Sequence, residues 1–447
     1  MRKPKIPPEK TNMELLKDEK KSKELFGYMI DEEINAFIKD MNDRYIHWDE
    51  LVYRTPPKNA SLPLIWNLMK FNRNSIAKKI KIGSFQFKFN ITDLIQYQLH
   101  QFDMNLGGSL GVTQDIPSEE KNRYLISSLM EEAIASSQLE GAATTRKVAK
   151  EMLRKARKPR DKSEKMIMNN YLTSKFIKNS KVKKLTPEFI FEIHKNITQD
   201  TLDNDMYAGK FRDTNDIFVI DTVSGEIAHE PPDFNLLKEL IDRLCDFANK
   251  EDSYFMHPII KASILHFLIG YIHPFVDGNG RTARALFYWY LIKEGYWIVE
   301  FMSISRVIIK SPIKYSRAYL YTESDENDLT YFLNYQLRTI KIALEELRRH
   351  IVKKSKNQKE FFKIVEKTED INIRQADIIH EFYTNEHKSI TIKEVQEVFD
   401  IVYETARKDL LELEEKGFLK KKTIGKKQFI FLRSNNFNKI MNKIIKD

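Results

Sequence analysis

The spacing of apolar and polar residues along the chain predicts a mainly α-helical protein. From about residue 118 to about residue 353, apolar residues recur at the three- and four-residue spacing of amphipathic helices. Two segments differ from this pattern. Residues 80–92, IKIGSFQFKFNIT, alternate apolar and polar positions and predict a short pair of strands. Residues 216–232, DIFVIDTVSGEIAHEPP, place two short β-prone runs around TVSG and predict a hairpin.

The same pattern divides the chain into four parts. Residues 1–117 are predicted to form an N-terminal arm and a helical region that includes the strand pair. Residues 118–345 are predicted to form a helical core, and residues 346–370 a charged linker helix. Residues 371–447 have a different organisation and predict a separate domain with a basic tail.

The C-terminal domain has the element order of a winged helix-turn-helix. The segments RQADIIHEFYTN, TIKEVQEVF and VYETARKDLLELEEKG predict three helices, and FLKKKTIGKKQFIFL predicts a hairpin after them. In that fold the third helix reads DNA, which gives candidate contacts at Thr405, Arg407 and Lys408, and in the hairpin at Lys426 and Lys427. Protein contact or dimerisation through the same domain is the alternative, and a homodimer is compatible with it.

Composition narrows the class of protein. The formal charge of +10 fits lysine-rich solvated helix faces, but from residue 416 onward ten Lys and Arg face a single acid, which forms a local basic patch. The single cysteine, Cys245, excludes a disulfide framework and argues against a cysteine-based zinc site. No secretory signal and no apolar run of about 18–20 residues is visible, so we expect a cytoplasmic protein without a membrane segment.

One strongly polar segment separates two apolar, helix-like runs. HPFVDGNGRTAR, residues 273–284, lies between KASILHFLIGYI and ALFYWYLI. Pro274 disfavours the helical conformation at His273, so the first helix should end there. Residues 274–280 are then predicted to form a loop, in which the glycines of GNG allow peptide N–H groups to turn inward and bind an anion.

The side chains of this segment suit a polyphosphate. The helix after the loop presents its N-terminus to the same anion, and Arg281 and Arg284 lie three residues apart on one face. Asp277 suits a Mg²⁺ ion that bridges phosphate oxygens, and His273 could take a proton from a hydroxyl at neutral pH. No GxxxxGK[ST] motif is present, which excludes a P-loop ATPase.

The segment resembles the signature of the Fic family, whose pattern is His-Pro-Phe-x-Asp/Glu-Gly-Asn-Gly-Arg-x-x-Arg. Every defined position of that pattern is matched, and the resemblance extends over roughly residues 120–300. It implies a helical Fic core that transfers AMP from ATP to a hydroxyl side chain of a protein. The implied roles are a general base at His273, a magnesium ligand at Asp277, an anion hole at Gly278, Asn279 and Gly280, phosphate contacts at Arg281 and Arg284, and a loop anchor at Phe275.

Two further segments fit the resemblance. The predicted hairpin at 216–232 matches the position of the family's flap, whose exposed strand would pair with the target, here through Ile217, Phe218, Val219 and Ile220. An ordinary surface hairpin is the alternative. The segment EEAIASSQLEGAATT by itself predicts an unremarkable helix end, with Ser136 and Glu140 on one face and Gly141 at the cap. It resembles the Fic inhibitory motif, on a helix at about 121–141, in which Glu140 would pair with Arg284 and block the γ-phosphate.

We therefore expect an autoinhibited, Mg²⁺-dependent protein adenylyltransferase, with ATP as substrate, self-modification included and removal of AMP left open. A DNA-binding regulator or toxin–antitoxin-like module, in which the Fic core senses nucleotide, is the alternative. A third hypothesis is a Fic core that uses another nucleotide or a phosphocholine donor. Candidates for stacking on the nucleobase are Tyr288, Tyr315, Tyr319 and Tyr331.

Overall fold

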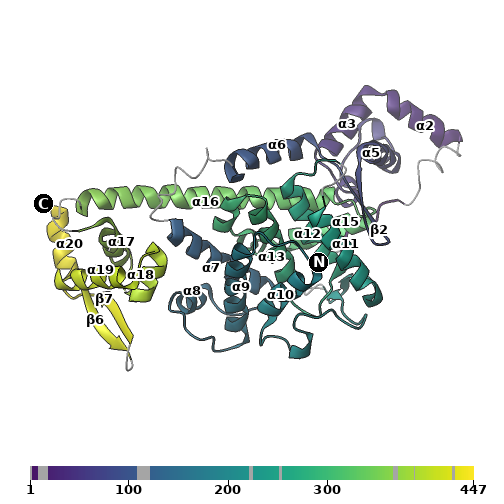
Figure 1. Cartoon of the computed structure of the whole chain (residues 1–447). Coiled ribbons are helices and arrows are strands. Elements are labelled where there is room, and N and C mark those ends of the chain that lie inside the picture. Colours follow the sequence, from purple (N-terminus) through teal and green to yellow (C-terminus); the bar gives the residue numbers. More distant parts are fainter. Residues whose placement is uncertain are drawn as a thin grey trace.

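The computed structural model describes residues 3–8, 19–107, 121–220, 225–250, 254–365, 371–386, 388–424 and 428–446. Within these residues the protein is mainly α-helical, as predicted, with three small antiparallel sheets. Figure 1 shows a helical body, an N-terminal extension at one end and a C-terminal domain at the other. No helix in the described ranges has the length and apolar character needed to cross a membrane.

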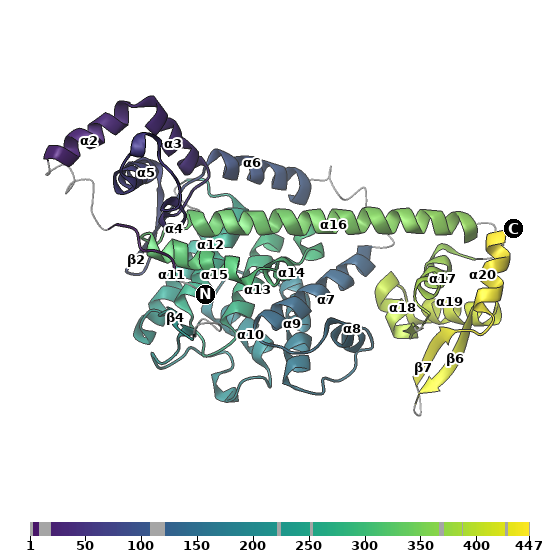
Figure 2. The same ribbon diagram turned by 180° about the vertical axis from the view of Figure 1, so that it is seen from behind.

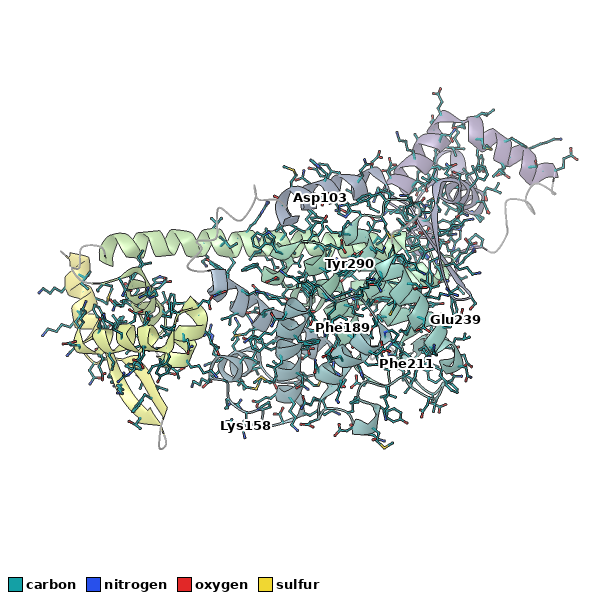
Figure 3. All side chains as sticks on the ribbon, in the orientation of Figure 1. Asp103, Lys158, Phe189, Phe211, Glu239 and Tyr290 are labelled. Atoms are coloured by element: carbon teal, nitrogen blue, oxygen red, sulfur yellow. The ribbon has the colours of Figure 1, made fainter. Side chains whose placement is uncertain are left out.

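Two consecutive helices form the centre of the body. They are α12 (Pro258–Ile272) and α13 (Asn279–Lys293), and they pack against each other along their lengths. Helix α12 is apolar on nearly every face because other helices surround it, and 12 of its 15 residues are buried. Side chains fill the space between these helices and their neighbours, among them Phe189 and Phe211 (Figure 3).

Shorter helices surround this pair. Helix α7 (Lys121–Leu139) packs on α9 (Lys162–Asn179), and α9 packs on both α10 (Pro187–Thr198) and α13. The remaining helices of the body are α8 (Arg146–Arg154), α11 (Leu237–Asn249), α14 (Ile304–Ile308) and α15 (Pro312–Ser324). This arrangement brings α7, α10 and the start of α13 together around the polar segment.

The N-terminal region has an apolar core of its own. Its helices are α2 (Glu19–Ile30), α3 (Glu32–Asp43), α4 (Trp48–Leu51) and α5 (Leu62–Ile76). The predicted strand pair follows as β1 (Lys78–Ile82) and β2 (Phe85–Phe89), and α6 (Asp93–Phe102) completes the region. Buried charges tie this region to the body, because Lys70 Nζ lies 2.6 Å from Asp325 Oδ1 and Tyr45 donates to Asp328 at 2.7 Å.

The prediction of a separate linker helix at 346–370 was wrong in its start. A single helix, α16 (Thr330–Val365), runs from inside the body toward the C-terminal domain (Figure 1). Its first half packs on α12 and α15, and Leu333, Leu337 and Ile340 are buried there. The sequence from 330 to 365 contains neither glycine nor proline, so nothing in it ends the helix where the composition becomes charged.

The C-terminal domain is the predicted winged helix-turn-helix. Its three helices are α17 (Ile373–Thr384), α18 (Ile392–Phe399) and α19 (Tyr403–Glu415), and its wing consists of β6 (Leu419–Ile424) and β7 (Gln428–Arg433). A two-residue strand, β5 (Ser389–Ile390), adds to the wing and gives the order β5-β7-β6. The predicted basic tail contains a helix, α20 (Phe437–Lys446). Figure 2 shows this domain beside α7, on which α18 packs.

Candidate active site

The polar segment begins where α12 ends. Helix α12 stops at Ile272, and His273 takes a left-handed backbone conformation with φ 49°, so Pro274 breaks the helix as predicted. The Nδ1 atom of His273 lies 3.2 Å from the carbonyl oxygen of Gly270. Because that oxygen only accepts, Nδ1 carries the hydrogen and Nε2 keeps its lone pair. Burial lowers the pKa of His273 to about 4, which leaves the imidazole neutral and able to accept a proton at pH 7.

The loop after His273 is closed by one amide side chain. Asn279 accepts from the backbone N–H of Phe275 at 2.9 Å and donates to the Phe275 carbonyl at 2.7 Å. The Asn279 side chain is buried and is committed to these two bonds, so it holds the loop rather than facing a ligand. Phe275 is fully buried, as predicted. The loop is shorter than the predicted 274–280, because α13 begins at Asn279.

A histidine that sequence reasoning missed supports the loop from below. His194 on α10 stacks on Phe275, with ring centroids 3.7 Å apart and an angle of 6° between the planes. Its Nδ1 accepts from the N–H of Gly209 at 2.9 Å, so Nε2 carries the hydrogen that it donates to the carbonyl of Asp277, also at 2.9 Å. Burial lowers the pKa of His194 to about 4, which keeps this neutral form in place. The sequence EIHKNI gave no sign of a partner 83 residues away.

The turn into α13 is shaped by its glycines. Gly278 has φ 84°, and a Cβ there would lie 2.8 Å from Cγ2 of Thr198. At Gly280 a Cβ would lie 2.2 Å from Oε1 of Glu140, so the missing side chain leaves room for that carboxylate above the first turn of α13. The Glu140 carboxylate therefore lies where a helix N-terminus would bind an anion.

The two arginines of α13 have different partners. Arg281 is buried, with its guanidinium 3.3 Å from both the Ile197 carbonyl and Oδ2 of Asp277, and its Nε has no hydrogen-bond partner within the described residues. Arg284 is also buried. It donates from Nε to Ser136 Oγ at 2.9 Å, and from its terminal amino group to the Ser136 carbonyl at 3.0 Å and to Glu140 Oε1 at 2.9 Å.

The contact expected between the end of α7 and Arg284 is therefore present. Burial alone would favour a neutral guanidinium, but the neighbouring Glu140 carboxylate keeps the pKa of Arg284 raised, so the pair is ionic. Helix α7 ends at Leu139, and Gly141 follows with φ 90°, which matches the predicted helix end.

Asp277 is the residue of the segment best placed for a cation. Its side chain is 50% exposed and ion-paired to Arg281 at 3.3 Å, whereas the guanidinium of Arg281 is fully covered. Magnesium in phosphate sites takes one or two carboxylates and completes its shell with phosphate oxygens and water. A half-exposed carboxylate beside a helix N-terminus fits that requirement.

The predicted flap is a hairpin, but its strand is shorter than predicted. The strands are β3 (Val219–Ile220) and β4 (Ile227–His229), with an irregularity between Val219 and Ile220. Ile217 and Phe218 precede the strand, so the strand predicted for 217–220 begins two residues later, at Val219. Phe218 and Ile220 are 41% and 55% exposed and lie two residues apart, as on one side of an extended chain.

A buried arginine fastens the start of the flap to the site, and sequence reasoning missed it as well. The backbone N–H of Arg212 donates to the Pro274 carbonyl at 2.9 Å, and its Nε donates to the His273 carbonyl at 3.0 Å. Its other nitrogens donate to the carbonyls of Thr214 and Pro232, at the two ends of the flap. One side chain thus fixes the flap and the loop together.

The tyrosines proposed for base stacking are held by other contacts. Tyr288 is buried and donates to Glu132, and Tyr331 lies in the polar network that joins the N-terminal region to the body. Tyr315 and Tyr319 lie beside His266, with the Tyr315 hydroxyl 2.8 Å from His266 Nε2. None of the four is a free ring at the loop.

The candidate DNA contacts lie on one helix and one wing. Arg407 and Lys408 on α19 are exposed, Thr405 is half-buried, and Arg407 is 3.2 Å from Glu404. Lys426 and Lys427 lie outside the described residues. On β6, Lys420, Lys421 and Lys422 are exposed and continue the basic surface.

A neutral histidine, a glycine turn at a helix N-terminus and two buried guanidinium groups lie together at the junction of α12 and α13 in a mainly helical protein. Residues 184–291 match the Fic/DOC family, and residues 374–426 match the DeoR-like helix-turn-helix domain. The chain therefore carries a Fic domain followed by a winged helix-turn-helix.

Named relatives match less than a third of the chain. The chain is 35% identical over 132 residues to a protein named protein adenylyltransferase Fic from Drosophila willistoni, which is 29% of this chain and 24% of that protein. It is 34% identical over 126 residues to the protein of the same name from Nematostella vectensis, which is 28% and 27% of the two chains. The match thus spans about a quarter of the length of these relatives.

A solved structure supports the fold over a longer stretch. The crystal structure of a Fic family protein from Desulfovibrio desulfuricans G20 matches with a TM-score of 0.50 and 15% identity, over 77% of this chain and 97% of that one. The Fic/DOC match covers residues 184–291, so Arg284 lies within it, whereas α7 and the residues Ser136 and Glu140 that contact Arg284 lie before it.

Proposed function

We propose that the protein is an autoinhibited protein adenylyltransferase that moves AMP from ATP to a Ser, Thr or Tyr hydroxyl of a protein, itself included. The observation that carries the proposal is the junction of α12 and α13. There a neutral His273 lies one short loop away from a helix N-terminus with a buried arginine on its first turn. The relatives named protein adenylyltransferase support the same chemistry.

The residues of the junction divide the reaction between them. His273 accepts the proton of the target hydroxyl on Nε2, and the oxygen forms a bond to the α-phosphorus of ATP. The bond from that phosphorus to the bridging oxygen breaks, and pyrophosphate leaves with the electron pair. The peptide N–H groups at the start of α13 face the phosphate oxygens, and Arg281 adds a fixed positive charge. Asp277 would hold a magnesium ion, which would neutralise charge on the phosphates.

Autoinhibition follows from the partners of Arg284. Nε and one terminal amino group of Arg284 donate to Ser136 and Glu140, so a γ-phosphate would have to displace a carboxylate to reach them. The same carboxylate covers the first turn of α13 above Gly280. An incoming triphosphate meets negative charge at both places, and binding in the posture for in-line attack is disfavoured.

Labelling with ATP that carries radioactive phosphorus in the α-phosphate tests the proposal. Glu140→Gly should raise transfer of label to protein, to the chain itself and to proteins of an added lysate, by at least about ten-fold, since a charged contact is worth ~1.5–3 kcal/mol. The double variant Glu140→Gly/His273→Ala should lose the label while it retains its folded circular dichroism. Equal labelling by Glu140→Gly and the unaltered protein would contradict autoinhibition by Glu140. Labelling that persists without His273 would contradict its role as the general base.

A second function, DNA binding, is favoured by the surface of the C-terminal domain. The exposed cations of α19 and β6 lie on the elements that contact DNA in winged helix-turn-helix proteins. Binding to a duplex should weaken steeply between about 50 and 200 mM salt, and Lys420→Glu/Lys422→Glu should reduce the slope of that dependence. A domain that contacts protein instead would show no duplex binding at the lower salt.

A further inference from the structure

The flap ends on a histidine that lies outside the signature and has two acceptors. His229, the last residue of β4, places Nδ1 2.8 Å from Oε2 of Glu323 on α15. Its Nε2 lies 2.7 Å from the backbone carbonyl of Tyr271, two residues before His273. The side chain of His229 is 9% exposed, so protein atoms rather than water meet both nitrogens.

Two acceptors require two hydrogens on the ring. A neutral imidazole has one N–H and one lone pair, whereas the carbonyl of Tyr271 and a carboxylate of Glu323 both need a donor. The protonated ring satisfies both at once. Glu323 supplies a matching charge, since among the described residues its one ion pair is with His229, and its second oxygen is buried without a hydrogen-bond partner.

We propose that His229 is held as an imidazolium and acts as a positioning residue that fastens the flap to the end of α12 and to α15. The inference rests on the proposed function in one respect, because it assigns a purpose to the flap. The flap would keep β3 in a fixed position relative to His273. Arg212 fixes the two ends of the flap, and His229 fixes its returning strand.

The charged groups around His229 affect its protonation. Glu323 on α15 and the neighbouring Glu230 favour the cation, and burial opposes it; together they leave the pKa of His229 raised. Burial is the main cause that lowers the pKa of His273. The charges of His229 and Arg212 lower it further, and the charge of Glu140 raises it. The ring that fastens the flap thus also favours the neutral form of the proposed base.

The protonation state can be measured without any reaction. In protein with ¹⁵N-labelled histidine, both ring nitrogens of His229 should show the shifts of N–H nitrogens at pH 7, and the loss of these signals in His229→Gln assigns them. In Glu323→Gln the ring should become neutral at pH 7, with one nitrogen moving to the shift of an unprotonated nitrogen. An unprotonated nitrogen on His229 of the unaltered protein at pH 7 overturns the proposal.

Hydrogen exchange tests the fastening itself. The amides of 219–220 and 227–229 should exchange at least about ten-fold faster in His229→Gln than in the unaltered protein at pH 6, since a charged hydrogen bond is lost. His100→Gln on the exposed face of α6 is the matched control and should leave these rates unchanged. A raised folded pKa means that the bond is present at low pH and lost as pH rises through it. The excess exchange of the variant, corrected for intrinsic rates, should therefore shrink toward pH 9.

The outcomes separate the two proposals. Exchange in His229→Gln within two-fold of the unaltered protein at pH 6, or an excess that does not change with pH, overturns the role of His229 and leaves adenylyl transfer untouched. Failure of the labelling experiment with Glu140→Gly overturns the proposed function and leaves the ring state and the exchange result standing.

Discussion

Gly278 illustrates how much of the site depends on single residues. Its φ of 84° is a conformation that a side chain disfavours, and a Cβ would also meet Thr198 at 2.8 Å. Gly295 at the end of α13 has φ 89° with open space around it, so it isolates the cost of conformation alone. We expect Gly278→Ala to lower the free energy of unfolding by about 2–3 kcal/mol and Gly295→Ala by about 1 kcal/mol. Urea unfolding of the two variants measures the difference; equal losses would remove the argument for tight packing beneath the loop.

The pH dependence of labelling follows from the state of His273. Because burial lowers its pKa to about 4, the fraction of neutral base does not change between pH 8 and pH 6 and falls only as the pH approaches 4. Initial labelling rates of Glu140→Gly should therefore show no acid limb above about pH 5. An acid limb centred near pH 6.5, the ordinary pKa of histidine, would show that His273 is more exposed to solvent than its contacts indicate.

Sequence reasoning found the residues of the site whose chemistry is local. The break at Pro274, the glycine turn and the paired arginines are read within twelve residues, and their positions in the structure agree with that pattern. His194 and Arg212 could not be found in this way, because their partners lie 83 and 61 residues further along the chain. The closure of the loop by the Asn279 side chain was not predicted, since closure of a loop by an amide depends on backbone geometry.

At the scale of elements, the two helices on either side of the polar segment and the order of the winged helix-turn-helix were predicted correctly. Periodicity and turn residues specify both. The length of α16 was missed because a change from apolar to charged composition was taken as a boundary, whereas a helix continues through such a change when no glycine or proline intervenes. Strand β5 is two residues long and exists only through pairing with β7, so no local pattern announces it.

Helix α7 is held to the body at points other than the inhibitory contact. Glu132 is buried and accepts from Tyr288, Ser303 and Ser305. Glu132→Ala should lower the free energy of unfolding by about 2–4 kcal/mol, because four donor groups on these three residues lose their acceptor. It should also raise labelling, because Ser136 lies on the same helix and Glu140 directly follows it. Glu151→Ala on α8 removes a pair with both side chains exposed and should cost less than about 0.5 kcal/mol. A stable Glu132→Ala protein with unchanged labelling would mean that α7 needs no such anchor.

At the scale of the whole molecule, α7 joins the two domains. The winged helix-turn-helix lies against its first half, around a cavity of about 270 Å³ that Tyr124 and Met130 line from α7 and Glu394 and Phe399 from the C-terminal domain. Its second half contains Ser136 and leads directly to Glu140, and both residues bind Arg284. The C-terminal domain and the residues that bind Arg284 are thus both in contact with, or next to, one continuous helix (Figure 2).

The junction of the domains should respond to pH through Glu394. Desolvation raises the pKa of Glu394 to about 7, although Arg154 on α8 acts in the opposite direction. A carboxyl group whose pKa is raised on folding binds its proton more tightly in the folded protein. Its contribution is therefore favourable at low pH and is lost as pH rises from about 4.5 through 7.

Glu394→Gln should remove this dependence. The variant should match the unaltered protein near pH 4.5 and be more stable by about 1–2 kcal/mol at pH 8, in urea unfolding followed at both values. Glu415→Gln, at the exposed end of α19, should follow the unaltered protein at both. If Glu394→Gln is no more stable than the unaltered protein at pH 8, the Glu394 carboxylate is solvated and is not buried between the domains. If Glu394→Gln is more stable at pH 8, the contact between α18 and α7 is more stable when Glu394 is protonated.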